Sequence, residues 1–467
     1  PGAFLLAAGA IAALGRSLEA LQLLHALWLA LGGLGVWWAA RALYDRDDEP
    51  RLGPRCAALA TAVYLVSAAM FSYNYSSWMT PASALAVGMA LRGLRRDAWA
   101  WSLGAGALAL LAFVTIQRAV VLAPLLGALW WWARRRSFPG ARLSALGGWL
   151  LGAALALIPL LLWYADAPAL LLHALVPIAT GLDYTTAATA GGSSLAALGH
   201  AGAQLLTVFW FPVGLVVLAA LATRCSTPSD AGVFVPGAVW LVASVVGAGL
   251  GGLRFYLHYL VQYAPALAVL AGHPALVRAC ARAVGPQARV CSRVLLAAAV
   301  LLAAGQLVEI GRGRGHRYEA MARRLEGGLT AAQAAGAHIR QRTAEGDTVQ
   351  AWGWTAWRVY YWAQRRAPGR IYKPLGAVTT FNTNTEFDAG GPIRFRDGPL
   401  ARELVEAFDR HPPAYFVYSP SMVRTFGAQP DPLEDFIALR RRIEQGYVPE
   451  ARFGDLQLLR RREPAPP

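Results

Sequence analysis

The chain has 467 residues, of which 56% are hydrophobic and only 15% are charged, and its mean hydropathy is +0.39. A soluble domain carries about 25% charged residues, so the composition excludes an ordinary soluble protein and indicates an integral membrane protein. The net charge of +16 comes almost wholly from arginine, since Lys373 is the only lysine. In a membrane protein such charge belongs to cytoplasmic loops, so we expect no nucleic-acid partner.

Segment 1–15 is apolar but shorter than the roughly 20 residues that cross a bilayer, so it is predicted to be a helix lying at the interface. The chain begins inside this segment at Pro1, and we therefore expect a fragment that lacks its true N-terminus. Apolar stretches then predict about ten transmembrane helices. They lie near 20–43, 54–72, 76–93, 98–115, 117–133, 143–164, 203–222, 232–252, 255–273 and 291–310.

The positions of the arginines orient these helices. The loops that hold nearly all arginines before residue 310 are 41–55, 92–97, 134–142, 224–230 and 274–293. The opposite side holds only Arg16, Arg118 and Arg254. Because positive charge marks the cytoplasmic side, the tail after residue 310 is predicted to lie outside the cytoplasm. The Ala, Leu and Arg bias is typical of a GC-rich bacterial genome, which places the chain in a bacterial inner membrane with its tail in the periplasm.

Two parts of the chain lie outside the predicted helices. Residues 165–202 form a long outer loop, which could face a substrate or simply connect two helices. The tail, 311–467, alternates helical and strand patterns and is predicted to be a small α/β domain. Its expected helices are 331–342 and 401–411, and its expected strands are 347–354, 413–419 and 453–462, the last of which closes a hairpin.

Unusual polar residues collect at the outer ends of the predicted spans. Arg254, His258 and Gln262 are spaced four apart, so an α-helix would place them on one face. Polar groups inside a membrane helix are expensive and mark functional sites. The full set of candidate substrate-binding residues is Asn74, Gln117, Arg118, Arg254, Tyr256, His258, Tyr259 and Gln262.

This mixture of side chains suits a lipid-linked phosphosugar. Arginine binds phosphate oxygens through paired, charge-assisted hydrogen bonds, histidine adds a donor, and tyrosine and glutamine bind hydroxyl or diphosphate oxygens. Any one of these residues could instead be an interfacial anchor, but three on one face are more than an anchor needs. The cysteines show no metal-binding spacing, and no His, Asp and Glu cluster is visible, so the cofactor stays open, a divalent cation included.

Three segments resemble a known family. "RFYLHYLVQYAPALAVLAG" at 254–272 and "VQAWGWTAWRVYYWAQRRAPGRIY" at 349–372 are similar to segments of bacterial GT-C glycosyltransferases related to the dolichyl-phosphate-mannose protein mannosyltransferases. The N-terminal stretch from "PGAFLLAAGA" to "RALYD" is similar to the part that follows their first outer loop. The resemblance implies a GT-C-like membrane domain at 1–310 and a periplasmic α/β domain at 311–467.

The same resemblance implies an activity. The protein would transfer a sugar from a polyprenyl-phosphate donor to a lipid, glycan or protein acceptor at the outer face of the membrane. The family's catalytic carboxylate lies in the first outer loop, before the point where this chain begins. No residue matches it, and Asp166 and Asp183 do not sit in the corresponding motif, so we expect this fragment alone to be inactive. The alternatives are a transporter or flippase of a lipid-linked anion and a non-catalytic membrane scaffold.

Overall fold

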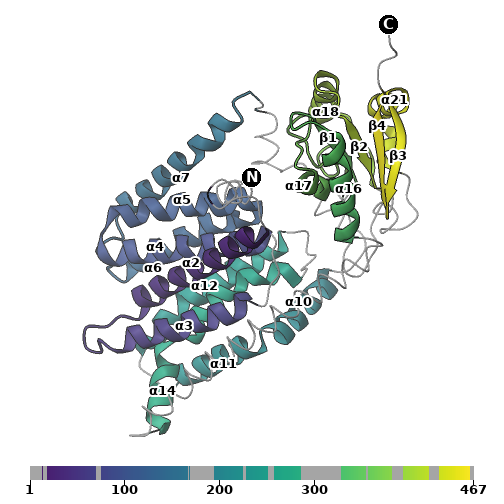
Figure 1. Cartoon of the computed structure of the whole chain (residues 1–467). Helices are drawn as coiled ribbons and strands as arrows, with labels where there is room; N and C mark the ends of the chain where they lie inside the picture. The colour runs from purple at the N-terminus through teal and green to yellow at the C-terminus, as the bar shows by residue number, and fades with distance from the viewer. Residues whose placement is uncertain are drawn as a thin grey trace. The chain divides into compact units, whose positions relative to one another are not determined.

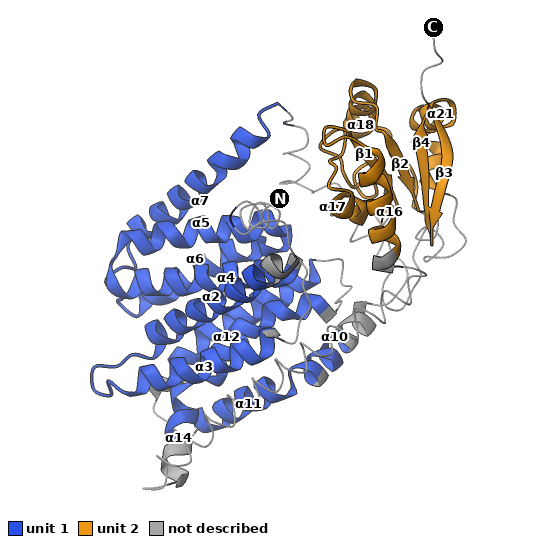
Figure 2. Ribbon diagram, in the orientation of Figure 1, with its two compact units in different colours: residues 1–177, 192–310 blue, residues 178–191, 311–467 orange. Residues whose placement is uncertain are grey.

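A computed structural model describes most of the chain. The described ranges are 18–69, 75–166, 194–224, 228–250, 257–284, 328–353, 356–380, 393–419 and 431–462, with residues 13 and 168. The chain divides into two compact units (Figure 2). One unit comprises residues 1–177 and 192–310, and the other comprises residues 178–191 and 311–467.

The first unit is helical (Figure 1). Its α-helices are α2 (Leu18–Tyr44), α3 (Leu52–Ala69), α4 (Tyr75–Arg96), α5 (Trp99–Thr115), α6 (Leu122–Arg135), α7 (Leu143–Trp163), α10 (Ser194–Val208), α11 (Trp210–Arg224), α12 (Pro228–Gly249), α13 (Ala264–Ala271) and α14 (Pro274–Val284). Two short 3₁₀ helices, η1 (Gln117–Val121) and η2 (Leu257–Tyr263), lead directly into α6 and α13.

Several of these helices are apolar enough to cross a membrane. Among the described residues, Leu23–Tyr44, Leu143–Trp163 and Gly232–Gly249 meet both the length and the hydropathy that a span requires. Shorter apolar helices cover Leu52–Ala68, Trp99–Thr115 and Trp210–Thr223. Much of their surface stays exposed; on α7, for example, Leu150 is 73% exposed and Leu162 is 72% exposed. Such large apolar surfaces are suited to contact with lipid rather than water.

Close helix packing builds the core of this unit. In Figure 1, α7, α5, α4, α2 and α3 lie side by side in that order. Helix α13 packs against α3, α11 and α12. The backbones of α2 and α4 approach so closely at Gly35 and Gly88 that a Cβ atom at Gly88 would overlap the carbonyl group of Gly35. Small residues permit this approach, as they do between other membrane helices.

The structure has helices at most of the predicted apolar segments and differs from the prediction at several places. The span predicted near 117–133 begins with the 3₁₀ helix η1, and the span predicted near 203–222 is divided between α10 and α11. The predicted span near 255–273 is not one α-helix, because Leu257–Tyr263 is a 3₁₀ helix and only Ala264–Ala271 is α-helical. The predicted outer loop at 165–202 is also too long, since α10 already begins at Ser194. Segments 1–12 and 291–310 lie outside the described residues.

The second unit is built on a four-stranded sheet with the strand order β1-β2-β4-β3. The strands are β1 (Val349–Trp352), β2 (Tyr415–Tyr418), β3 (Tyr447–Phe453) and β4 (Leu456–Arg461). Strands β1 and β2 are parallel, whereas β4 runs antiparallel to both β2 and β3. The hairpin of β3 and β4 carries an irregularity between Pro449 and Ala451. The strands expected at 347–354, 413–419 and 453–462 correspond to β1, β2 and β4.

Helices accompany the sheet of the second unit. They are α16 (Gly328–Arg342), η4 (Ala356–Arg358), α17 (Val359–Ala363), α18 (Pro399–Arg410), α20 (Pro432–Asp435) and α21 (Ile437–Gly446). Val349 and Val417 pack with residues of α16 and α17 in one apolar cluster. The ring of Phe416, next to Val417 on β2, contacts the ring of Phe408 on α18. Successive strand residues point to opposite faces, so the sheet is covered on both sides.

Candidate functional site

Arg118 lies at the centre of a buried polar region in the first unit. Helix α5 ends at Thr115 because Ile116 adopts an extended backbone with φ −153° and ψ 128°, and the chain then turns through η1. This turn carries Arg118 inward, where its side chain is only 7% exposed. Its Nη2 donates a hydrogen bond of 2.8 Å to the Oγ of Ser76 on α4. A buried cation must be compensated by neighbouring groups, so this position is specialised.

In addition to Ser76, the ring of Tyr259 on η2 contacts this cation. The Arg118 Cζ atom lies 3.5 Å from the centroid of the Tyr259 ring, which is a cation–π contact. The neighbouring His258 packs edge-on against Tyr259, with 4.6 Å between the ring centroids. Segments far apart in sequence, η1, η2 and the start of α4, therefore meet at one guanidinium group.

Gln262 is buried close by but does not lie on the same face as His258. In the 3₁₀ helix there are about three residues per turn, so residues four apart are rotated by about 120° around the axis. The α-helical expectation of one shared polar face is therefore wrong for these two residues. Gln262 is 7% exposed and lines a small cavity with Thr80, Ser83 and Ser244.

Two further polar residues extend the region into α2. His25 is 2% exposed, and its Nε2 lies 2.9 Å from the Oγ of Ser77 on α4. The His25 ring also contacts the ring of Trp78, at 5.3 Å between centroids. Sequence reasoning missed both His25 and Ser77. The available signal was a lone histidine inside an apolar helix, which by itself more often indicates a structural role.

The remaining candidates divide into described and undescribed positions. Gln117 belongs to η1 beside Arg118 and is half-buried. Asp166, at the turn after α7, is exposed. Asn74, Arg254, Tyr256 and Asp183 lie outside the described residues. The structure thus brings together Arg118, His258, Tyr259 and Gln262 from the predicted set. No group of three or more His, Cys, Asp and Glu side chains is arranged to hold a metal ion among the residues that the structure describes.

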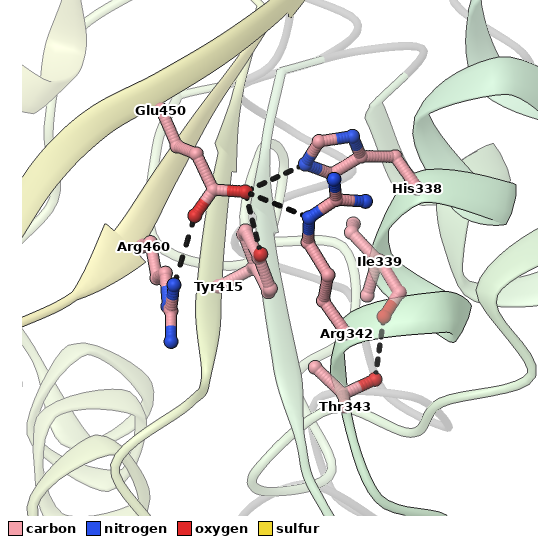
Figure 3. Close-up of polar contacts among 7 residues, drawn as sticks. All are labelled: His338, Ile339, Arg342, Thr343, Tyr415, Glu450 and Arg460. Carbon is pink, nitrogen blue, oxygen red and sulfur yellow. Dashed lines mark hydrogen bonds and ion pairs between the residues drawn. The ribbon is translucent and has the colours of Figure 1, made fainter.

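A separate polar cluster lies in the second unit, around Glu450 on β3 (Figure 3). His338 on α16 donates to Glu450 Oε1 at 2.6 Å, and the hydroxyl of Tyr415 on β2 donates to the same oxygen at 2.9 Å. Arg342 and Arg460 approach the carboxylate at 3.6 and 3.7 Å. One carboxylate therefore links a helix to three strands.

The protonation of this cluster follows from its contacts. Partial burial alone would raise the pKa of Glu450, but the hydrogen bonds from His338 and Tyr415 and the nearby positive charges hold that pKa below its ordinary value. Burial, together with the hydrogen bond to Glu450, raises the pKa of Tyr415 to about 12. Glu450 is therefore ionised and Tyr415 is neutral at neutral pH, and the arrangement serves to hold α16 on the sheet.

Comparison with solved structures identifies the fold. No protein-family model matches the chain, and no curated protein matches it. The crystal structure of ArnT from Cupriavidus metallidurans bound to undecaprenyl phosphate superposes with a TM-score of 0.54 at 15% identity, over 98% of this chain and 86% of ArnT. The apo structure of ArnT gives a TM-score of 0.52 at 14% identity, over 98% of this chain and 87% of ArnT.

A more distant overlap is found with the archaeal oligosaccharyltransferase AglB from Archaeoglobus fulgidus, with a TM-score of 0.42 at 13% identity. This overlap covers 90% of the present chain and 61% of AglB, so the fold assignment rests on ArnT. The chain therefore shares the fold of ArnT, which is consistent with the resemblance to GT-C glycosyltransferases seen in its sequence.

Proposed function

Starting from the GT-C fold, we propose that this protein transfers a sugar from a polyprenyl-phosphate donor to an acceptor at the outer face of a membrane. The acceptor is a lipid, a glycan or a protein. We further propose that residues 1–310 form the membrane domain, with 1–15 at the interface, and that residues 311–467 lie in the periplasm of a bacterium. The concentration of arginines in alternate loops supports this topology.

The observation that carries the proposal is the placement of Arg118. Its guanidinium is buried in an apolar helical unit and is oriented by the Ser76 hydroxyl and the Tyr259 ring. A planar guanidinium held in this way is pre-organised to bind phosphate oxygens through two parallel hydrogen bonds. The ArnT structure with undecaprenyl phosphate bound supports a polyprenyl phosphate as the ligand.

These residues have a defined role in the proposed reaction. The acceptor oxygen attacks the anomeric carbon of the sugar, the bond from that carbon to the phosphate oxygen breaks, and a general base takes the acceptor proton. Negative charge then grows on the departing lipid phosphate. Arg118 stabilises this charge, because a fixed cation in a water-poor site interacts with it more strongly than water does. Half-buried His258 lies beside Tyr259 and offers a second hydrogen-bond donor.

The test is sugar transfer by the full-length protein in proteoliposomes, with radiolabelled polyprenyl-phosphate sugars as donors. Arg118→Ala should lower the rate by about 10–100-fold, the effect of losing hydrogen bonds to a charged group. The matched control is Arg135→Ala, which removes an arginine that contacts the ring of Trp131 at the end of α6. Full activity of Arg118→Ala would reject the phosphate site, and transport of the intact donor without transfer would reject the enzyme.

A further inference from the structure

A small cavity lies in the first unit beside the Arg118 site, by which we mean the Arg118 guanidinium together with Ser76 and Tyr259. Its volume is about 20 Å³, and four polar side chains line it together with apolar groups such as Trp240 and Leu125. The four are Thr80 and Ser83 on α4, Ser244 on α12, and Gln262 on η2. All four are buried, with exposed fractions of 0%, 8%, 6% and 7%. A polar cavity at this depth in an apolar unit needs an explanation.

The hydrogen bonds of the three hydroxyl groups are already directed into their own helices. Thr80 donates to the carbonyl of Ser76 at 2.8 Å, Ser83 to that of Met79 at 3.1 Å, and Ser244 to that of Trp240 at 3.0 Å. Each hydroxyl oxygen keeps lone pairs that can accept another hydrogen bond. The hydroxyl oxygens can therefore act as acceptors toward a guest in the cavity.

Gln262 contributes the complementary group. Its Nε2 is fully buried and has no hydrogen-bond partner among the residues that the structure describes. A buried amide without a partner is destabilising, so native proteins seldom leave one unsatisfied. The cavity thus presents an unused donor from Gln262 and unused acceptors from Thr80, Ser83 and Ser244.

We infer that this cavity binds one water molecule. A space of about 10–15 Å³ is enough for a water, which needs two to four polar partners. The cavity meets both requirements. Water accepts the hydrogen bond of the Gln262 amide and donates to the hydroxyl oxygen of Ser244 and to that of Thr80 or Ser83. An ion suits the cavity less well than water does. A cation would be repelled by the amide hydrogens of Gln262, and an anion would be repelled by the lone pairs of the hydroxyl oxygens.

The bound water joins three elements that surround Arg118. It links Gln262 on η2, three residues after Tyr259, to α4, which carries Ser76, and to α12. Ser76 and Tyr259 are the two residues that orient the guanidinium. The water therefore positions the walls of the Arg118 site without touching a substrate. This inference goes beyond the proposed activity and holds whatever the protein transfers.

The direct test is a high-resolution map of the full-length protein, with the Ser244→Val variant as a comparison. The unchanged protein should show one density peak within hydrogen-bond distance of Gln262 and two hydroxyl oxygens. Ser244→Val fills the space with methyl groups and should remove that peak while the helices stay in place. An empty cavity, or a peak that changes with sodium or potassium concentration, overturns the inference.

A double-mutant cycle tests the bridge in solution. Gln262→Leu and Ser244→Ala should each lower the Tm, and the double variant should lower it by less than the sum, because both changes break one water bridge. The control pairs Gln262→Leu with Ser67→Ala. Ser67 is 3% exposed on α3 and donates to the Val63 carbonyl at 2.7 Å, but it does not line the cavity. The control pair should be additive, and additivity in both pairs overturns the bridge.

Discussion

The Cζ atom of Arg118 lies 3.5 Å from the centroid of the Tyr259 ring, although the two residues are far apart in sequence. The contact joins η1 to η2, and each of these segments is a short 3₁₀ helix that precedes an α-helix. A cation over an aromatic face gains about 0.5–2 kcal/mol, more when water is excluded. The ring therefore helps to compensate a charge that is almost completely buried.

Replacement of Tyr259 separates the contribution of the ring from that of the hydroxyl. Tyr259→Leu should weaken binding of polyprenyl phosphate by about 2–30-fold, the equivalent of about 0.5–2 kcal/mol, because Arg118 loses its aromatic wall. Tyr259→Phe keeps the ring face and should stay within about threefold of the unchanged protein. Binding is measured by titration of the purified protein in detergent. Equal weakening in both variants would show that the hydroxyl, not the ring, carries the effect.

Gly247 on α12 tests how tightly the site is packed. A Cβ atom there would lie 3.1 Å from Val121 Cγ2 and 3.3 Å from both the Arg118 carbonyl oxygen and Gln262 Oε1. Gly247→Ala should therefore lower the Tm and weaken polyprenyl-phosphate binding, since η1 and η2 must shift to accommodate the methyl group. The overpacking should cost about 1–3 kcal/mol.

The matched control for this change is Gly214→Ala. Gly214 lies within α11, and a Cβ atom there would meet nothing within 4 Å. The control should leave binding unchanged and keep or slightly raise the Tm, because alanine is less flexible than glycine in a helix. An equal loss of binding in the two variants would show that the space around Gly247 is not specific to the site.

The Glu450 cluster predicts a pH dependence in the second unit. The pKa of Glu450 is held below its ordinary value of 4.5, so the folded state favours the ionised carboxylate. The resulting stabilisation is complete above that ordinary value and is lost as the pH falls through the lowered pKa. The protection of the α16 amides in the full-length protein, taken as the intrinsic exchange rate divided by the measured rate at each pH, should therefore fall below about pH 4.5.

Glu450→Gln should make the protection of the α16 amides less dependent on pH. It should also lower the stability of the second unit by about 1–3 kcal/mol, so that these amides exchange faster at neutral pH. The control is Asp409→Asn, which breaks an exposed pair with Arg442 at 2.6 and 2.7 Å. Exposed pairs contribute at most about 1 kcal/mol, so this variant should change exchange in α16 very little. A pH profile in Glu450→Gln that matches the unchanged protein would assign the dependence to other carboxylates.

Replacement of Arg365 by lysine tests whether positive charge alone is enough to stabilise the second unit at this position. It is 9% exposed and closes the end of α16, where it donates to the carbonyl of Thr343 at 2.6 Å and to the Thr343 hydroxyl at 3.0 Å. Lysine keeps the charge but lacks the planar fork that reaches several acceptors. Arg365→Lys should destabilise the second unit by about 1–3 kcal/mol, measured as faster amide exchange in α16. Unchanged exchange would show that charge alone is sufficient.

The sequence predicted the elements better than their local geometry. Apolar length and alternating residue patterns located most helices of the first unit, α16 and α18 of the second unit, and the strands β1, β2 and β4, because these signals are repeated along each segment. The 3₁₀ geometry of η2 could not be predicted, since the residues of 257–263 suit an α-helix equally well. In the structure, the 3₁₀ segment η2 packs against α4 and α12, which are distant in sequence.

The candidate site was predicted only in part. The sequence predicts Arg118 and Tyr259 as site residues because polar groups at the outer end of a membrane helix are unusual. Their direct contact across 141 residues was not predictable from spacing, which reports only on neighbours within one element. Ser244 and His25 were missed for the same reason, since each is a single polar residue in an apolar helix and gains meaning only from its partners.

The two edges of the sheet in the second unit limit how a peptide acceptor could be held. At the outer edge, Pro449 has no amide hydrogen to donate, and the irregularity beside it interrupts the regular ladder of β3. At the opposite edge, the amides of Val349 and Ala351 are already bonded to the Arg366 carbonyl and the Tyr360 hydroxyl. Capture of an extended chain as an additional strand is therefore disfavoured at both edges, and recognition of a peptide by the described part of this unit would rely on side chains.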